Sequence, residues 1–309
     1  MNWQPTATRS ALQHRQTVLR RVREYFYHQH VLEVETPLLM DQPVSDPFIS
    51  SLKTNSGFLH TSPEYAMKRL LAAGYGDCWQ YCKVFRGDER GQKHLPEFSM
   101  LEWYRVGFDL PMLIAEVIDL IRTAAQCHVA AVQRTYEQWF ALATNGLNPH
   151  SATLAELQSL ASEWIDVSDL DRNACLDILM THVVEPSFDP AVISVVTDYP
   201  ASQAALAVRS KDWQGHEVAQ RFEVYWQGLE LANGYLELTD ADEQRARFEH
   251  DNEVRQQYQL PTVALDEKLL AAMAHGLPRS AGVALGFDRL LMAMLQASDI
   301  DQVVAFANR

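Results

Sequence analysis

An arginine and an aromatic residue frame a polar stretch between two hydrophobic runs. Arg86 closes the run WQYCKVFR, and Phe98 opens the run FSMLEWYRV. A guanidinium fork suits a phosphate because it donates two charge-assisted hydrogen bonds, and an aromatic ring stacks on a base. The polar stretch between them, residues 87–97, is rich in glycine and charge, so it predicts either a nucleotide-binding loop or a solvated hairpin tip.

Two carboxylates lie seven residues apart in the segment GLELANGYLEL, residues 228–238. In a regular strand Glu230 and Glu237 would face opposite sides. A bulge at Asn233-Gly234 would bring both toward one pocket. There they would hold Mg²⁺ on a nucleotide or pair with a substrate ammonium, and the alternative is that both acids face solvent.

A third candidate segment, GVALGFDR at residues 282–289, combines glycines with an arginine. Glycine allows a backbone to approach a ligand closely, and Arg289 stands where an apolar helix begins. The segment matches neither the phosphate-binding nor the dinucleotide-binding glycine pattern. Ordinary turn glycines therefore remain the alternative interpretation.

The elements that must position these residues are readable from hydrophobic spacing. Residues 10–29 predict an amphipathic helix whose arginines would meet an acidic partner or solvent: Arg15, Arg20, Arg21 and Arg23. Residues 31–39 predict an extended segment interrupted by Pro37. Residues 62–73 predict a helix with Ser62 as N-cap and Pro63 in its first position.

The remaining pattern alternates strands with helices. The runs 79–86 and 98–106 predict an antiparallel hairpin, and 221–228 predicts a half-buried strand. Strands are also expected at 193–197 and 230–238. Helices are expected over most of 110–145, after Thr153, over 171–185 and over 240–258. Residues 282–295 predict a strand that runs into a helix. This pattern favours an α+β fold in one domain, residues 1–309.

Composition narrows the functional classes. There are 26 Lys and Arg against 40 Asp and Glu, a formal net charge of −14, which argues against a general nucleic-acid binder. The first 110 residues carry 13 basic and 12 acidic side chains, so an anionic ligand is expected there. The four cysteines predict reduced thiols, and no secretory signal or membrane-length apolar run is visible, which favours a cytoplasmic protein.

Together these segments resemble the class II aminoacyl-tRNA synthetases. VLEVETP resembles motif 1, VFRGDERGQKHLPEFSMLEWYR resembles motif 2, and GVALGFDR resembles motif 3. The likeness is closest to lysyl-tRNA synthetases and to their truncated paralogues that modify elongation factor P. It extends through HTSPEYAMKRLL, YPASQAAL and RFEVYWQGLELANGYLELTDA. The resemblance implies an antiparallel β-sheet flanked by helices, and a homodimer formed through motif 1.

The resemblance also implies roles in ATP binding. Arg86 would bind the α-phosphate, and His94 would lie near the departing pyrophosphate. Phe98 and Arg289 would sandwich the adenine. The remaining implied contacts are Glu230 with Mg²⁺, Leu231 beside the adenosine, and Gly286 close to the nucleotide.

For the amino acid, a lysine-like ligand needs two separate acidic anchors. The resemblance implies that Glu64, in Ser62-Pro63-Glu64, takes the amine near the carboxylate. Glu237 with Tyr104, helped by Glu102, would take the distal ammonium. Asn233 and Tyr235 would line the same pocket.

The chain departs from the family pattern at four positions. The usual Arg-Asn-Glu of motif 2 reads Arg86-Gly87-Asp88, and Leu95 stands where an ATP-contacting Asn is usual. These changes put nucleotide affinity in doubt, although Asp88 could still contact the adenine or a loop amide. Ala284 replaces a motif 3 glycine, and its methyl group would crowd an α-amino acid and favour a β-amino acid.

The resemblance implies that the chain activates (R)-β-lysine with ATP and transfers it to a lysine amine of elongation factor P. Only about ten residues precede the motif 1 helix, which leaves no room for an anticodon-binding domain, so tRNA aminoacylation is the alternative. A catalytically silent regulatory paralogue is a further alternative. It should have lost Arg86, Glu230 or Arg289, and all three are present.

Overall fold

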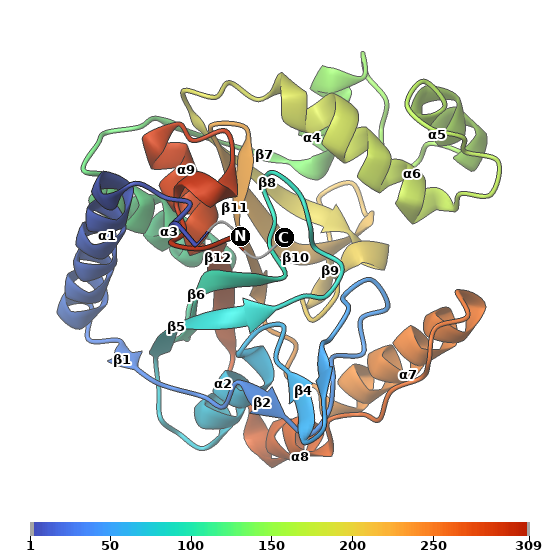
Figure 1. Cartoon of the computed structure of the whole chain (residues 1–309). Helices are drawn as coiled ribbons and strands as arrows, with labels where there is room; N and C mark the ends of the chain where they lie inside the picture. Colours follow the sequence, from blue (N-terminus) through green and yellow to red (C-terminus); the bar gives the residue numbers. More distant parts are fainter. Residues whose placement is uncertain (1–2, 308–309) are drawn as a thin grey trace. The chain divides into compact units, whose positions relative to one another are not determined.

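The computed structural model of the chain describes residues 3–307, which form two units (Figure 1). The first unit consists of the chain up to Cys127 and from Glu237 onward. The second unit is His128–Leu236. Each unit has its own antiparallel strands and helices, so the α+β prediction is confirmed, whereas one domain over residues 1–309 stays a prediction.

Four strands of the first unit lie side by side in the order β1, β5, β6, β12. Their bounds are β1 Leu32–Glu33, β5 Cys78–Phe85, β6 Glu97–Val106 and β12 Ser280–Gly286. The expected hairpin is confirmed, because β5 and β6 pair antiparallel with Val84 opposite Phe98. β12 pairs antiparallel with the other edge of β6. Motifs 2 and 3 are thus neighbours through backbone hydrogen bonds.

Helices and a small second sheet complete the first unit. The helices are α1 Arg9–His28, α2 Glu64–Ala72, α3 Leu110–Ala125, α7 Ala241–Gln257, α8 Glu267–Gly276, α9 Phe287–Leu295 and a 3₁₀ turn at Ile300–Gln302; the small sheet has the order β2 Leu39–Met40, β4 Gly57–Leu59, β3 Lys53–Thr54. Phe26 of α1 stacks on Trp79 of β5 with ring centres 4.7 Å apart, and it meets the edge of Trp103. This aromatic cluster fixes α1 against the sheet.

The start of α2 differs from the prediction. The helix begins at Glu64, and Pro63 is its N-cap instead of its first helical residue. Ser62 does not occupy the N-cap position, yet its hydroxyl oxygen still accepts a hydrogen bond from the Glu64 amide at 3.0 Å. That hydroxyl also donates to Glu102, so the turn is set by a contact that the local sequence does not show.

The second unit has the strand order β11, β10, β8, β7, with β9 also on β10. The strands are β7 Ala131–Thr135, β8 Ile193–Pro200, β9 Arg209–Lys211, β10 Glu217–Trp226 and β11 Leu229–Leu236. The helices are α4 Tyr136–Ala143, α5 Leu154–Ala161, α6 Arg172–Leu179, a π-helical turn Met180–Val184 and 3₁₀ turns at Glu185–Ser187 and Ala201–Gln203. The capping box of Thr153 and Glu156 is confirmed at the start of α5.

The structure adds detail to two expectations for the second unit and shows that a third is wrong. Residues 131–135 form β7, parallel to β8, inside the stretch expected to be mostly helical. The helix expected over 171–185 ends at Leu179, where the backbone widens into a π-turn. β10 is not half-buried, because Glu223 and Tyr225 on its polar face are only 7% and 4% exposed.

The bulge in β11 is also displaced from its expected position. Gly234 pairs regularly with Phe222, whereas the register shifts between the pairs Val224–Ala232 and Tyr225–Glu230. Leu231 therefore has no residue opposite it. The physical reason is that a bulge is defined by the partner strand, and the glycine at 234 does not require one.

The cysteines and the lengths of the helices can be compared with the expectations from the sequence. All four cysteines are free thiols, and Cys78, Cys82 and Cys175 are buried. Burial raises the pKa of the Cys78 and Cys82 thiols to about 12, so both are unreactive at neutral pH. No helix within residues 3–307 is long and apolar enough to cross a bilayer.

Candidate functional site

Arg86 and Phe98 lie together at the loop end of the β5–β6 hairpin. The guanidinium carbon of Arg86 stands 5.3 Å from the centre of the Phe98 ring. Its Nη1 is 3.0 Å from the Glu89 carboxylate, and its Nε is 3.4 Å from the Thr61 carbonyl oxygen. The structure thus places the predicted phosphate-binding arginine on the predicted base-stacking ring, with Glu89 as a weakly held counterion that an anion could replace.

His94 and Arg289 form a second contact in motifs 2 and 3. The guanidinium of Arg289 donates to Nε2 of His94. Burial and the charge of Arg289 lower the pKa of His94, so the ring is neutral and can accept this hydrogen bond. A Cβ on Gly286 would lie 3.7 Å from the Arg289 side chain, which shows how closely the arginine crosses that glycine.

The three departures from motif 2 have distinct environments. The Gly87 amide donates to the Ser50 carbonyl, and a Cβ on Gly87 would come within 3.1 Å of Ser50 and Leu52, so glycine fits the close packing. Asp88 is exposed. Leu95 is only 3% exposed, so its position is an interior one in which an aliphatic side chain packs.

Glu102 is the centre of the candidate amino-acid site. One carboxylate oxygen accepts from the Tyr104 hydroxyl at 2.7 Å, and the other accepts from Ser62 at 2.7 Å. The residue is 2% exposed, and burial, followed by repulsion from Glu64, raises its pKa to about 8. Residues from β6 and from the α2 turn therefore hold one buried carboxyl in place.

A buried lysine that we did not predict joins the other two acids of the site. The ammonium of Lys68 lies 2.6 Å from Glu64 Oε1 and 2.5 Å from Glu237 Oε2, and its side chain is 1% exposed. Glu64 and Lys68 stand four residues apart on α2, a spacing that makes a helical ion pair. That spacing in the segment HTSPEYAMKRLL was the available sequence signal for Lys68.

The acids of this site are only partly ionised at neutral pH. Burial raises the pKa of Glu237 to about 7 even though Lys68 opposes the shift. Glu64 and Glu237 thus share the Lys68 ammonium, and the raised pKa values of Glu102 and Glu237 mean that these two groups resist ionisation until a further cation arrives. The arrangement can bind a ligand that brings its own ammonium groups.

Glycine and alanine in β12 set the space beside this cluster. A Cβ on Gly282 would come within 2.3 Å of the Tyr104 ring and 2.4 Å of Glu237 Oε1, so only glycine fits there. Ala284 lies opposite Glu102 in the β12–β6 pair and, like Phe98, packs against the buried residues Cys82, Val84 and Met100. Side chains alternate along a strand, so Gly282, Ala284 and Gly286 share one face.

The candidate residues of the second unit share a face of β11 because of the bulge at Leu231. Glu230 lies opposite Tyr225, Asn233 opposite Glu223 and Tyr235 opposite Arg221. Directly opposed residues point to the same side, so Glu230, Asn233 and Tyr235 lie on one face. Leu231 is 2% exposed. The predicted bulge is thus at the wrong residue, although a bulge does set which side Glu230 faces.

A buried polar network supports this face. Tyr199 donates to Glu223 at 2.6 Å, and Arg221 and Tyr225 also contact the Glu223 carboxylate. The Arg221 guanidinium lies 5.9 Å from the Tyr235 ring centre. Asn233 Oδ1 is buried and has no hydrogen-bond partner among the described residues, so it is available to a ligand donor.

Only Glu230 among these residues offers a carboxylate suited to Mg²⁺. It is half-buried on the same face as Asn233, and carboxylate oxygens are the ligands that Mg²⁺ prefers. Mg²⁺ usually takes one or two protein carboxylates and completes its shell with water and phosphate oxygens. A single carboxylate therefore fits the ion as a partner of a nucleotide.

Of the α1 arginines that we considered as a basic face, Arg15 is turned into the protein. Arg15 is 16% exposed, and its guanidinium binds Asp288 at 2.5 Å, Ser99 at 2.7 Å and Tyr81 at 2.9 Å. It therefore ties α1 to β6 and α9 and is not available to a partner. Arg20 and Arg23 are exposed side chains paired with acids of their own unit.

Comparison with known proteins agrees with this geometry. A family model described as tRNA synthetases class II (D, K and N) matches residues 1–309. An elongation factor P–(R)-β-lysine ligase from Mannheimia succiniciproducens is 47% identical, and the alignment covers 98% of this chain and 97% of that protein. Ligases of the same name from Haemophilus ducreyi and Pectobacterium carotovorum are 45% and 44% identical; each alignment covers 99% of this chain, and 96% and 97% of those proteins. The chain therefore belongs to the class II tRNA synthetase family.

Proposed function

We propose that this chain is an ATP-dependent ligase that activates (R)-β-lysine as an aminoacyl-adenylate and transfers it to a lysine ε-amine of elongation factor P. The observation that carries the proposal is the set of acids at Lys68 and the α2 turn. Glu64, Glu102 and Glu237 are arranged for a ligand with more than one ammonium, and the relatives that share nearly the whole length are named as β-lysine ligases.

The first step that we propose joins the amino acid to AMP. A carboxylate oxygen of β-lysine attacks the α-phosphorus of ATP, and the bond to the β-phosphate breaks, so that pyrophosphate leaves. Arg86 neutralises the charge that develops at the α-phosphate, and no protein nucleophile is needed. We assign His94 to the pyrophosphate, Phe98 and Arg289 to the adenine, and Gly286 to the backbone beside it.

Several assignments on the nucleotide side rest on the family resemblance. We assign Glu230 to Mg²⁺, which when bound offsets phosphate charge, and Leu231 to the adenosine. Gly87 and Asp88 stay predicted nucleotide contacts. The burial of Leu95 supports a packing role at that position in place of the lost Asn contact.

On the amino-acid side, we assign Glu64 to the amine nearer the reacting carboxylate. The distal ammonium is assigned to Glu102, Tyr104 and Glu237. Its positive charge favours ionisation of the two buried carboxyl groups, and the ionised groups in turn bind the ammonium. Ser62 and Pro63 shape the α2 turn beside this site. We assign Asn233 and Tyr235 to the same ligand because the family resemblance implies it, and we propose that the Ala284 methyl group favours an amine displaced by one carbon.

The second step transfers the acyl group. The unprotonated ε-amine of the acceptor lysine attacks the carbonyl carbon of the adenylate, the bond to the AMP oxygen breaks, and the amine loses a proton. The products are an amide and AMP. We further propose that the protein acts in the cytoplasm and as a homodimer formed through motif 1.

Two measurements test the proposal. ATP–pyrophosphate exchange should depend on (R)-β-lysine more strongly than on α-lysine, and Arg86→Lys should slow it by about 10²–10³-fold because a single ammonium lacks the guanidinium fork. Labelled β-lysine should then appear on elongation factor P when that protein and tRNA are offered together. Label on tRNA alone would establish the synthetase alternative, and no exchange with any amino acid would establish a silent paralogue.

A further inference from the structure

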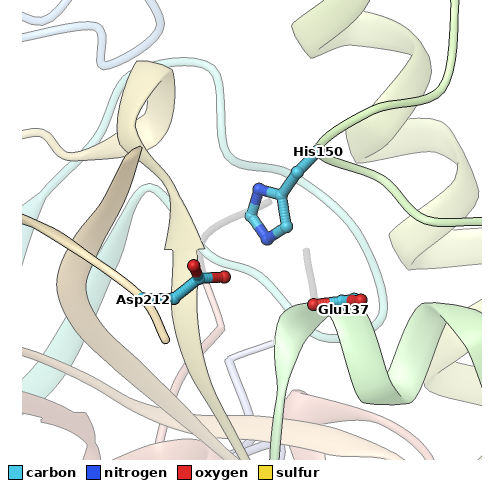
Figure 2. A group of neighbouring side chains, drawn as sticks. All are labelled: Glu137, His150 and Asp212. Atoms are coloured by element: carbon cyan, nitrogen blue, oxygen red, sulfur yellow. The ribbon is translucent and has the colours of Figure 1, made fainter. Parts of the chain in front are cut away.

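Three potential metal ligands lie close together in the second unit (Figure 2). The proposed reaction uses none of them. Glu137 lies in the first turn of α4, His150 in the loop before α5, and Asp212 directly after β9. One ligand atom from each lies within 4.8 Å of the others. Figure 2 shows the imidazole of His150 above the two carboxylates.

Asp212 is held in place by its own turn. Its Oδ1 accepts the amide N–H groups of Gln214 and His216, each at 2.8 Å. Its Oδ2 is 3.0 Å from Nδ1 of His216. Oδ1 already accepts two hydrogen bonds, whereas Oδ2 has one partner and keeps a lone pair for a ligand, so the carboxylate is oriented with Oδ2 still able to bind.

Glu137 is held by two neutral amides from different segments. Asn148 donates to Oε1 at 2.9 Å, and Gln214 donates to Oε2 at 2.7 Å. Asn148 also accepts the amide N–H of residue 150 at 2.8 Å. These bonds couple the position of Glu137 to both other segments of the cluster.

His150 is fixed by stacking and not by hydrogen bonds. Its ring lies 5.0 Å from that of His216 with an interplanar angle of 16°. Among residues 3–307, neither ring nitrogen of His150 has a hydrogen-bond partner, and neither Glu137 nor Asp212 pairs with a lysine or arginine. Two carboxylates and an imidazole therefore lie together in this part of the described structure with no lysine or arginine paired to either carboxylate.

We propose that Glu137, His150 and Asp212 form a binding site for a first-row divalent transition-metal ion, with zinc the best match. One imidazole nitrogen with two carboxylate oxygens suits zinc, whereas Mg²⁺ and Ca²⁺ prefer oxygen alone. Ligand atoms around tetrahedral zinc are about 3.4 Å apart, so small side-chain rotations close the site. A water completes the shell, and His216 orients Asp212 from behind.

The ion would join α4, the loop before α5 and the β9–β10 turn. It would therefore stabilise the second unit, and it shares no residue with the ATP or amino-acid assignments. The proposal is independent of the proposed function for this reason.

The test uses the full chain after metal removal with a chelator. Zn²⁺ titrated calorimetrically should bind one equivalent that His150→Ala loses, and Co²⁺ should give a visible absorption band that the same variant lacks. Glu137→Gln, which keeps the shape of the side chain, should also lose the site. His216→Ala should weaken binding by about 10–100-fold, as expected for a group that orients a ligand.

The matched control is His182→Ala, which removes an exposed imidazole stacked on Trp164 in the same unit. This variant should keep the equivalent of Zn²⁺ and the Co²⁺ band. Zn²⁺ should also raise the thermal unfolding midpoint of the parent chain and of His182→Ala, but not of His150→Ala. The proposal is wrong if the parent chain binds no stoichiometric Zn²⁺, or if Glu137→Gln and His150→Ala both bind it as the parent does.

Discussion

Replacing Lys68 with methionine should destabilise the folded protein, and the size of the effect should depend on pH. The methionine keeps the length and apolar stem of the side chain but removes the ammonium that lies 2.6 Å from Glu64 and 2.5 Å from Glu237. Because Lys68 is 1% exposed, water cannot replace it without rearrangement. Three acids would then share a buried site without a counterion.

The magnitude follows from burial. Removing one partner of a buried ion pair costs about 3–5 kcal/mol, against a total stability of about 5–15 kcal/mol for a typical domain. Protonation of Glu237 limits the cost, since burial already raises its pKa to about 7 and loss of Lys68 raises that pKa further. We therefore expect a loss of about 3 kcal/mol at alkaline pH.

The sign of the pH dependence is fixed by proton binding. Above about pH 7 the folded variant holds a proton on Glu237 that the folded parent has released, so the variant loses stability relative to the parent as pH rises. Urea unfolding followed by tryptophan fluorescence should show the full loss at about pH 8.5. The loss should fall to roughly half at about pH 6, where Glu237 is largely protonated in both proteins.

The matched control is Lys268→Met, which breaks an exposed ion pair with Asp41 in the same unit. Its urea midpoint should equal that of the parent at both pH values. Adding (R)-β-lysine should return part of the stability to Lys68→Met, because a substrate ammonium supplies the missing charge. A destabilisation below about 1 kcal/mol, or one that does not change with pH, would refute the reasoning.

Three further substitutions test the same pocket. Gly282→Ala places a Cβ within 2.3 Å of the Tyr104 ring, so the KM for the amino acid in pyrophosphate exchange should rise at least about tenfold. The control is Gly91→Ala, whose added Cβ meets no atom within 4 Å, and its KM should equal that of the parent. Equal KM values in the two variants would contradict the packing argument. Burial raises the pKa of Glu102 to about 8, so the free energy of unfolding of the parent falls as pH rises from about 4.5 to about 8. Glu102→Gln should therefore be more stable to urea than the parent at about pH 9 but not at about pH 4.5. The same variant should lose amino-acid binding. An equal or lower stability at pH 9 would be inconsistent with a buried carboxylate. Ala284→Gly should shift the exchange preference from β-lysine toward α-lysine by about 10-fold, and an unchanged preference would remove the methyl group from the specificity argument.

The hairpin, the strand-to-helix motif and most helices could be predicted because their signals are local. Runs of aromatic and β-branched residues identify β5 and β6, and the capping box at Thr153 identifies the start of α5. β7 escaped prediction because its five residues are held by pairing with β8, which lies some sixty residues away. A short strand of this kind has too little local pattern to compete with the helices around it.

The candidate site divides in the same way. Arg86 and Phe98 were predictable because they end adjacent strands of one hairpin, and the structure brings them together. Lys68 was missed, since a lysine four residues after a glutamate is usually an exposed helical pair. Only the tertiary fold, which adds Glu237 from a distant segment, shows that this pair is buried.

The unpaired residue in β11 is what allows Glu230 and Asn233, three residues apart in the sequence, to face the same side. If Leu231 were drawn into regular pairing, the ladder would slip by one residue and Glu230 would turn to the opposite side of the strand, away from Asn233 and Tyr235. Removing Leu231 would instead leave Glu230 opposite Tyr225 and Asn233 opposite Glu223, so the three polar side chains would keep their common face. In an alignment of related chains, a one-residue gap at this position would therefore be compatible with the same chemistry.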